Sequence, residues 1–127
     1  MNPVEAQFEA LREIYPNAVR QPLSDGSSIV TVPNVAVPEG WTARETTIRF
    51  QVPVGYPMAR PDCFWTDESL MLSGGRLPQN TGPTPLPGGG APTPQRWYSW
   101  HVTHWSANSD TLITYVNVIR KRFAETR

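Results

Sequence analysis

The sequence predicts one α+β domain over residues 1–127: an N-terminal helix, a four-stranded antiparallel meander, a long loop rich in proline and glycine, and a C-terminal helix. Apolar residues recur every three or four positions near both ends of the chain, which is typical of helices packed on one face. In the middle of the chain they alternate with polar residues, which is typical of strands with one buried face. We therefore expect the helices to cover one face of the sheet.

The first helix is indicated by its start, its period and its end. Asn2 is a suitable N-cap, and Pro3 suits the first helical position because its missing N–H is not needed there. Pro16 ends the helix. The apolar positions in between are Val4, Phe8, Leu11 and Ile14.

The strands follow in sequence order. A turn at Ser24–Gly26 separates the first two strands, which we place within residues 19–32. The clearest strand spans residues 46–54, where Ile48, Phe50 and Val52 alternate with polar side chains. Residues 63–65 form a further strand.

The loop and the last helix complete the chain. Residues 74–94 hold six of the 14 prolines and six of the nine glycines, a composition that excludes a helix or a central strand. Such a loop is either a solvated insertion or functional, as a flap over a site or a docking segment. Ser109 or Asp110 can cap the last helix, which ends in the basic run 120–122. Its apolar positions are Leu112, Tyr115, Val116, Ile119 and Phe123.

Composition excludes several classes of function. Eleven basic and 11 acidic residues cancel, so no basic field is expected to attract nucleic acid or an anionic membrane. A single cysteine excludes an internal disulfide and a cysteine-rich zinc site. No apolar run approaches the ~18 residues of a membrane span, and Glu5 and Glu9 do not fit a signal peptide. We expect a cytoplasmic protein.

Two segments resemble a known superfamily. Residues 50–65 read FQVPVGYPMARPDCFW and are similar to the Tyr-Pro-x-x-x-Pro stretch of the ubiquitin-conjugating (UBC-like) fold; residues 105–123, WSANSDTLITYVNVIRKRF, resemble the segment after its active site. Residues 33–37 and 97–105 are most similar to the bacterial branch, prokaryotic family E. The resemblance implies a transferase that takes the C-terminal glycine of a ubiquitin-like modifier from an adenylating activating enzyme as an acyl ester and passes it to an amine. It implies no cofactor.

The nucleophile is where the chain departs from that resemblance. The family uses a cysteine, which should lie in the neighbourhood of Trp97–His101, and this segment has none. Cys63 precedes the loop and is expected to be a core residue. The family's asparagine, which stabilises the oxyanion, has one upstream counterpart here, Asn80.

Ser99 and His101 are the candidates for nucleophile and base. In an extended chain they project to the same face, so the imidazole can activate the hydroxyl. Ser99 would then hold the modifier as an oxyester. The only carboxylate that follows nearby is Asp110.

His104 is the last candidate in this block. It could assist catalysis or pair with His101 on a metal, but two histidines and one distant cysteine leave a zinc shell incomplete, so no metal is expected. One of the two histidines is alternatively a structural residue whose ring bonds to loop backbone.

A second class of function stays open. Without the cysteine, the chain could be a non-catalytic UBC-like or RWD-like adaptor that binds the modifier or the activating enzyme. The acidic positions Glu5, Glu9 and Glu13 on the first helix differ from the basic residues by which the family usually meets that enzyme. Lys121 is the only lysine, which reflects either genome composition or selection against amines that compete for activated acyl groups.

Overall fold

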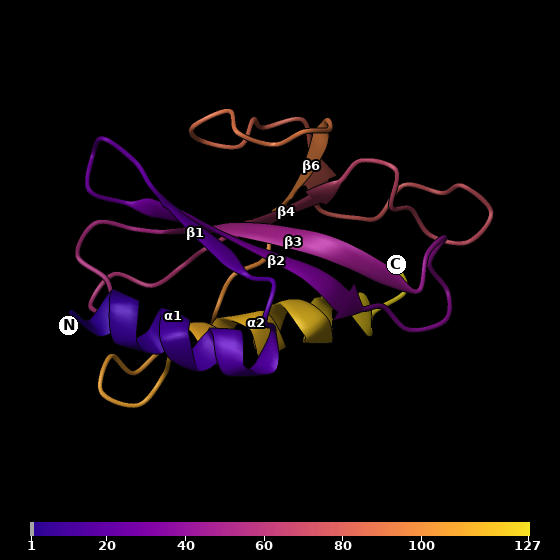
Figure 1. Cartoon of the computed structure of the whole chain (residues 1–127). Coiled ribbons are helices and arrows are strands. Elements are labelled where there is room, and N and C mark those ends of the chain that lie inside the picture. The colour runs from indigo at the N-terminus through magenta and orange to yellow at the C-terminus, as the bar shows by residue number, and fades with distance from the viewer. Residues whose placement is uncertain (1) are drawn as a thin grey trace.

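The computed structural model describes residues 2–127 as two helices and one sheet (Figure 1). The element order confirms the predicted α+β class. The bounds are α1 Pro3–Ile14, β1 Val19–Pro22, β2 Ser28–Ala36, β3 Glu45–Val52, β4 Phe64–Asp67, β5 Thr81–Gly82, β6 Gln95–Tyr98 and α2 Leu112–Phe123.

Both helices lie on the same face of the sheet (Figure 1). The Asn2 side chain accepts the Glu5 N–H at 2.9 Å, as expected of the predicted cap of α1. The cap of α2 was wrongly predicted: it is Thr111, which forms a capping box with Thr114. Asp110 is not available because its carboxylate accepts the Ser106 N–H at 2.7 Å. Within residues 2–127, neither helix has the length and apolar character needed to cross a membrane.

The sheet has six strands in the order β1-β2-β3-β4-β6-β5, with every neighbouring pair antiparallel. The prediction of four strands was therefore too low. The two extra strands, β5 and β6, lie within and just after the proline-rich loop. They are only two and four residues long, so their alternation is too short to be recognised from the sequence.

The core lies between the sheet and the helices. The Phe64 and Tyr98 rings, paired across β4 and β6, stack with centroids 4.5 Å apart. Phe123 of α2 meets the Phe64 ring edge-on at 5.8 Å. This packing places the C-terminal end of α2 against the end of β6. The segment that follows β6 therefore starts next to α2.

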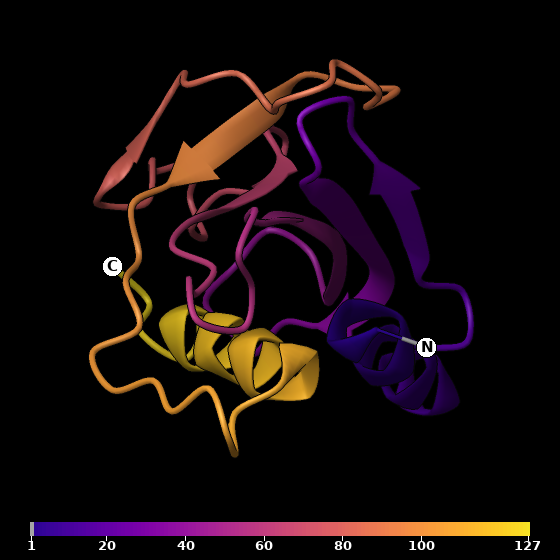
Figure 2. The same ribbon diagram turned by 90° about the vertical axis from the view of Figure 1, so that its left-hand side faces the viewer.

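Residues 83–94 of the proline-rich loop lie on the other face of the sheet. Trp65 alternates with core residues along β4, so its side chain lies on that outer face. It is only 3% exposed, and its Nε1–H donates to the Thr84 carbonyl at 2.8 Å. Gly88 has a φ of +81°, a conformation that favours glycine, and a Cβ there would lie 2.8 Å from the end of the Leu23 side chain. Figure 2 shows the loop reaching the β1–β2 hairpin.

We predict that Asp67 fastens this loop. Its carboxylate accepts the Thr93 hydroxyl at 2.6 Å and the Ser69 N–H at 3.0 Å, and these bonds, the Thr93 bond foremost, hold its pKa below the usual value. Asp67→Ala should lower the free energy of unfolding by about 1 kcal/mol and speed proteolysis within residues 83–94. Urea unfolding with limited proteolysis tests this, with exposed Glu68→Ala as the control.

The pH dependence of that stabilisation follows from the sign of the shift. Because the folded pKa of Asp67 is depressed, the contribution is complete above the pKa of the unfolded carboxyl and is lost as the pH falls through the folded pKa. The difference between wild type and Asp67→Ala should therefore shrink on acidification. An equal difference at acidic and neutral pH would contradict the assignment.

Candidate active site

A pocket of about 740 Å³ lies between the segment after β6 and the outer side of α2. The four residues predicted from the sequence as site residues all line it: Asn80, Ser99, His101 and His104. Figure 2 shows the segment after β6 leaving the sheet and passing beside α2. Of the loop 74–94, only Asn80 lines the pocket, so the loop is not the flap that we considered; its contacts hold it on the outer face.

The backbone of the pocket is held from both sides. The Ser99 N–H donates to the Asn80 carbonyl at 2.8 Å, directly after β6 ends. The Trp105 Nε1–H donates to the Pro57 carbonyl at 2.9 Å, and its ring lies 5.9 Å from that of Tyr56. These contacts tie residues 99–105 to the Tyr-Pro segment, although the two are far apart in sequence.

Ser99, His101 and Asp62 form a line of hydrogen-bonding groups. The Ser99 Oγ lies 3.5 Å from His101 Nε2, and His101 Nδ1 lies 2.6 Å from Asp62 Oδ1. An ionised carboxylate only accepts, so in the neutral imidazole the tautomer that satisfies this contact carries its proton on Nδ1 and presents the Nε2 lone pair to the hydroxyl. The 3.5 Å distance between Ser99 Oγ and His101 Nε2 is long for a hydrogen bond, but such distances are common in unliganded sites and shorten when substrate binds. The arrangement suits general-base activation of a serine.

Asp62 completes this line and was not predicted from the sequence. It lies 39 residues before His101, and its side chain is 59% exposed, as is that of His101. Asp110, the carboxylate near in sequence, instead closes the turn at Ser106. The local signal was limited to the position of Asp62 within the segment similar to the ubiquitin-conjugating fold.

Asn80 has an uncommon backbone conformation, and its carbonyl is fixed by a hydrogen bond. Its φ of 59° is in the left-handed region, where asparagine is tolerated better than most residues. Its carbonyl is engaged by Ser99, whereas its side-chain amide makes no hydrogen bond within residues 2–127. The amide N–H groups are therefore free to donate to an oxygen in the pocket.

Neither histidine has the structural role that we considered. His101 bonds to side chains only, and His104 makes no hydrogen bond among the described residues, so neither ring is bound to loop backbone. Residues 2–127 contain no group of three or more histidine, cysteine and acidic residues close enough to hold a metal ion. His104 adds an exposed imidazole to the pocket wall.

Cys63 is outside the pocket and has the wrong chemistry for a nucleophile. It is half-buried, and burial raises the pKa of its thiol, an effect that a hydrogen bond with Trp97 only partly offsets. The thiolate, which is the reactive form, is thus disfavoured at neutral pH. The Ser99 oxygen, in contrast, lies 3.5 Å from an imidazole nitrogen.

Comparisons with known proteins identify the family of the chain. No curated protein and no solved structure matched the chain. A family model described as Prokaryotic E2 family E matches residues 13–126, which includes the whole pocket and Asp62. The chain therefore belongs to prokaryotic E2 family E, with a UBC-like α+β fold.

Proposed function

We propose that this protein accepts a ubiquitin-like modifier from an adenylating activating enzyme as an oxyester on Ser99 and transfers it to an acceptor. The observation that carries the proposal is the line Ser99–His101–Asp62 in a pocket without a cysteine. Membership of an E2-like family supports the modifier and the activating enzyme as the general classes of partner.

Acylation begins with the activated carbonyl of the modifier in the pocket. As Ser99 Oγ attacks the carbonyl carbon, His101 Nε2 takes the hydroxyl proton, and Asp62 holds the ring through Nδ1–H. The Asn80 amide is placed on the wall to donate to the oxyanion. The bond to the leaving group breaks, and His101 returns its proton to that group.

Transfer reverses the same steps with a different nucleophile. The acceptor attacks the ester carbon, the bond to Ser99 Oγ breaks, and the acceptor's proton passes through His101 to the serine oxygen. His104 lies on the pocket wall, where its imidazole can contact the incoming acceptor. No cofactor is required.

Intact mass spectrometry tests the proposal with a defined acyl donor. The protein is incubated with a short peptide thioester that ends in glycine, and we expect an adduct that resists thiols, is cleaved by hydroxylamine and maps to Ser99. Ser99→Ala should abolish it. Ser106→Ala is the matched control, because Ser106 is an exposed serine of the same loop outside the pocket.

Each other outcome contradicts the proposal in a different way. An adduct on Cys63 would move the active site to the segment just before β4. If no residue forms an adduct, the transferase assignment is wrong and the adaptor function remains, in which case the pocket binds the modifier without a covalent step.

A further inference from the structure

The chain's only lysine lies in the candidate active site. Lys121 lines the same pocket as Ser99 and His101, from the last turn of α2. Thr114 and Val118 line it as well, so these three residues form one stripe along the helix at spacings of four and three. Lys121 is exposed, and no carboxylate within residues 2–127 forms an ion pair with it.

We propose that Lys121 is a self-modification site, to which Ser99 passes its own acyl group. This inference rests on the proposed function, because it needs the Ser99 oxyester as donor. Neighbouring Arg120 and Arg122 cannot replace Lys121, since a guanidinium stays protonated and is not a nucleophile. Lysine is the one side chain of the pocket that can form a stable amide.

The transfer step is balanced without any further reactant. The Lys121 ammonium first releases one proton to solvent; the neutral amine then attacks the ester carbon, an N–C bond forms, and the C–O bond to Ser99 Oγ breaks. The proton lost by the nitrogen goes through His101 to the serine oxygen, which restores the hydroxyl. An amide is far less reactive than an ester, so the product is an end state and not an intermediate.

The consequence is a limit on the activity of the protein. The amide places a modifier in the pocket that has to receive the next one, so a modified molecule is closed to further acylation. Sharing a pocket replaces a bimolecular encounter by an intramolecular one, which favours Lys121 whenever no external acceptor arrives. External acceptors should therefore protect the protein from self-modification.

The test uses the full chain and the same glycine-ending peptide thioester, without an acceptor. We expect a hydroxylamine-labile adduct on Ser99 first, followed by a hydroxylamine-resistant adduct on Lys121. Lys121→Arg keeps the charge and should form only the labile adduct, which should persist longer. Ser99→Ala should form neither.

A lysine moved to another surface provides the matched control. The double variant Arg12→Lys/Lys121→Arg keeps one lysine but places it on exposed α1, outside the pocket, and should form no resistant adduct on a side chain. A Ser99 ester that never yields a Lys121 amide would overturn this inference and leave the proposed function intact. A Lys121 amide formed equally in Ser99→Ala would overturn the route through the ester. Absence of any adduct would refute both proposals.

Discussion

His101→Ala is expected to slow acylation of Ser99 by about 10²–10⁴-fold, the usual contribution of a positioned general base. The variant keeps the proposed nucleophile but removes the imidazole, 3.5 Å away, that we propose takes its proton. Because the His101 side chain is 59% exposed, its loss should leave the unfolding midpoint near that of wild type. Rapid-quench mass spectrometry with the peptide thioester gives the rate.

His104→Ala separates the two histidines. His104 lines the same pocket but, within residues 2–127, forms no hydrogen bond with Ser99 or Asp62, so this variant should retain most of the acylation rate. If acylation is slower in His104→Ala than in His101→Ala, the roles of the two histidines are reversed.

Asp62→Ala tests the third group. We expect a smaller loss of acylation rate than in His101→Ala. The carboxylate, 2.6 Å from Nδ1, selects the Nδ1–H tautomer, so without it the neutral imidazole is no longer confined to that form. Nitrogen NMR of His101 reports the tautomer directly. A variant that loses rate while keeping the tautomer would show that Asp62 acts otherwise than as a positioning residue.

Elements with a local signal were predictable from the sequence. The start of α1 depends on Asn2 and Pro3, which are adjacent to it in sequence. The alternation of Ile48, Phe50 and Val52 along β3 reflects one buried face and is visible within a few residues. The proximity of Ser99 and His101 was predictable for the same reason, because an extended chain places residues two apart on one side.

Features that depend on distant contacts were not predictable. Asp62 meets His101 across 39 residues, and no spacing rule relates a loop before one strand to a segment after another. The strand β5 exists because it pairs with β6, and Trp65 orders the proline-rich loop by bonding to Thr84. Composition correctly excluded a helix there, but it could not show that the loop packs on the outer face.

Arg122→Ala is expected to lower the free energy of unfolding by about 3–4 kcal/mol, which combines the cavity left by a buried side chain with the loss of three charge-assisted hydrogen bonds. Arg122 is only 2% exposed, although it stands among exposed basic residues. Its guanidinium donates to the Glu125, Gln79 and Arg127 carbonyls at 2.8–2.9 Å. It also lies 5.6–5.8 Å from the ring centroids of Trp41, Tyr98 and Trp100.

The same guanidinium links stability to the candidate site. By holding the Gln79 carbonyl it fixes Asn80, whose own carbonyl accepts the Ser99 N–H. Arg122→Lys should therefore recover part of the stability through its positive charge, but not the acylation rate, since one ammonium cannot reproduce a planar fork of donors to three carbonyls. Guanidinium chloride unfolding and the acylation assay measure the two effects separately.

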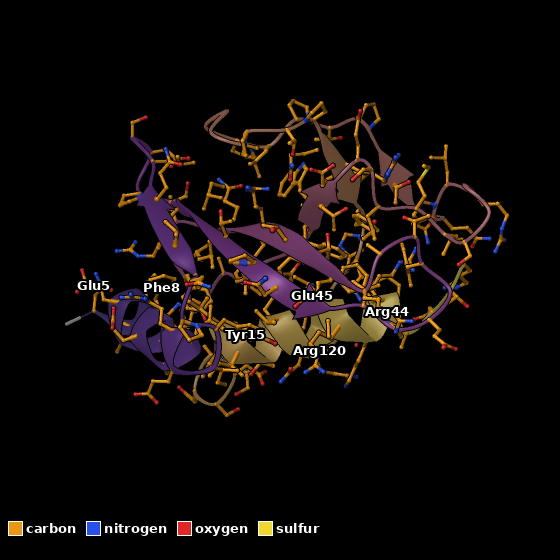
Figure 3. All side chains as sticks on the ribbon, turned by 45° about the vertical axis from the view of Figure 1, so that its right-hand side comes forward. Glu5, Phe8, Tyr15, Arg44, Glu45 and Arg120 are labelled. Carbon is orange, nitrogen blue, oxygen red and sulfur yellow. The ribbon has the colours of Figure 1, made fainter. Side chains whose placement is uncertain are left out.

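Arg120→Ala is the matched control for Arg122, because Arg120 (labelled in Figure 3) is exposed on the same turn of α2. Its unfolding free energy should stay within about 0.5 kcal/mol of wild type. If Arg122→Ala and Arg120→Ala were equally stable, the buried hydrogen bonds of Arg122 would contribute nothing net. If Arg122→Lys acylated at the wild-type rate, the anchoring of Asn80 through Gln79 would be unnecessary for the nucleophile, and the position of Ser99 would depend on β6 alone.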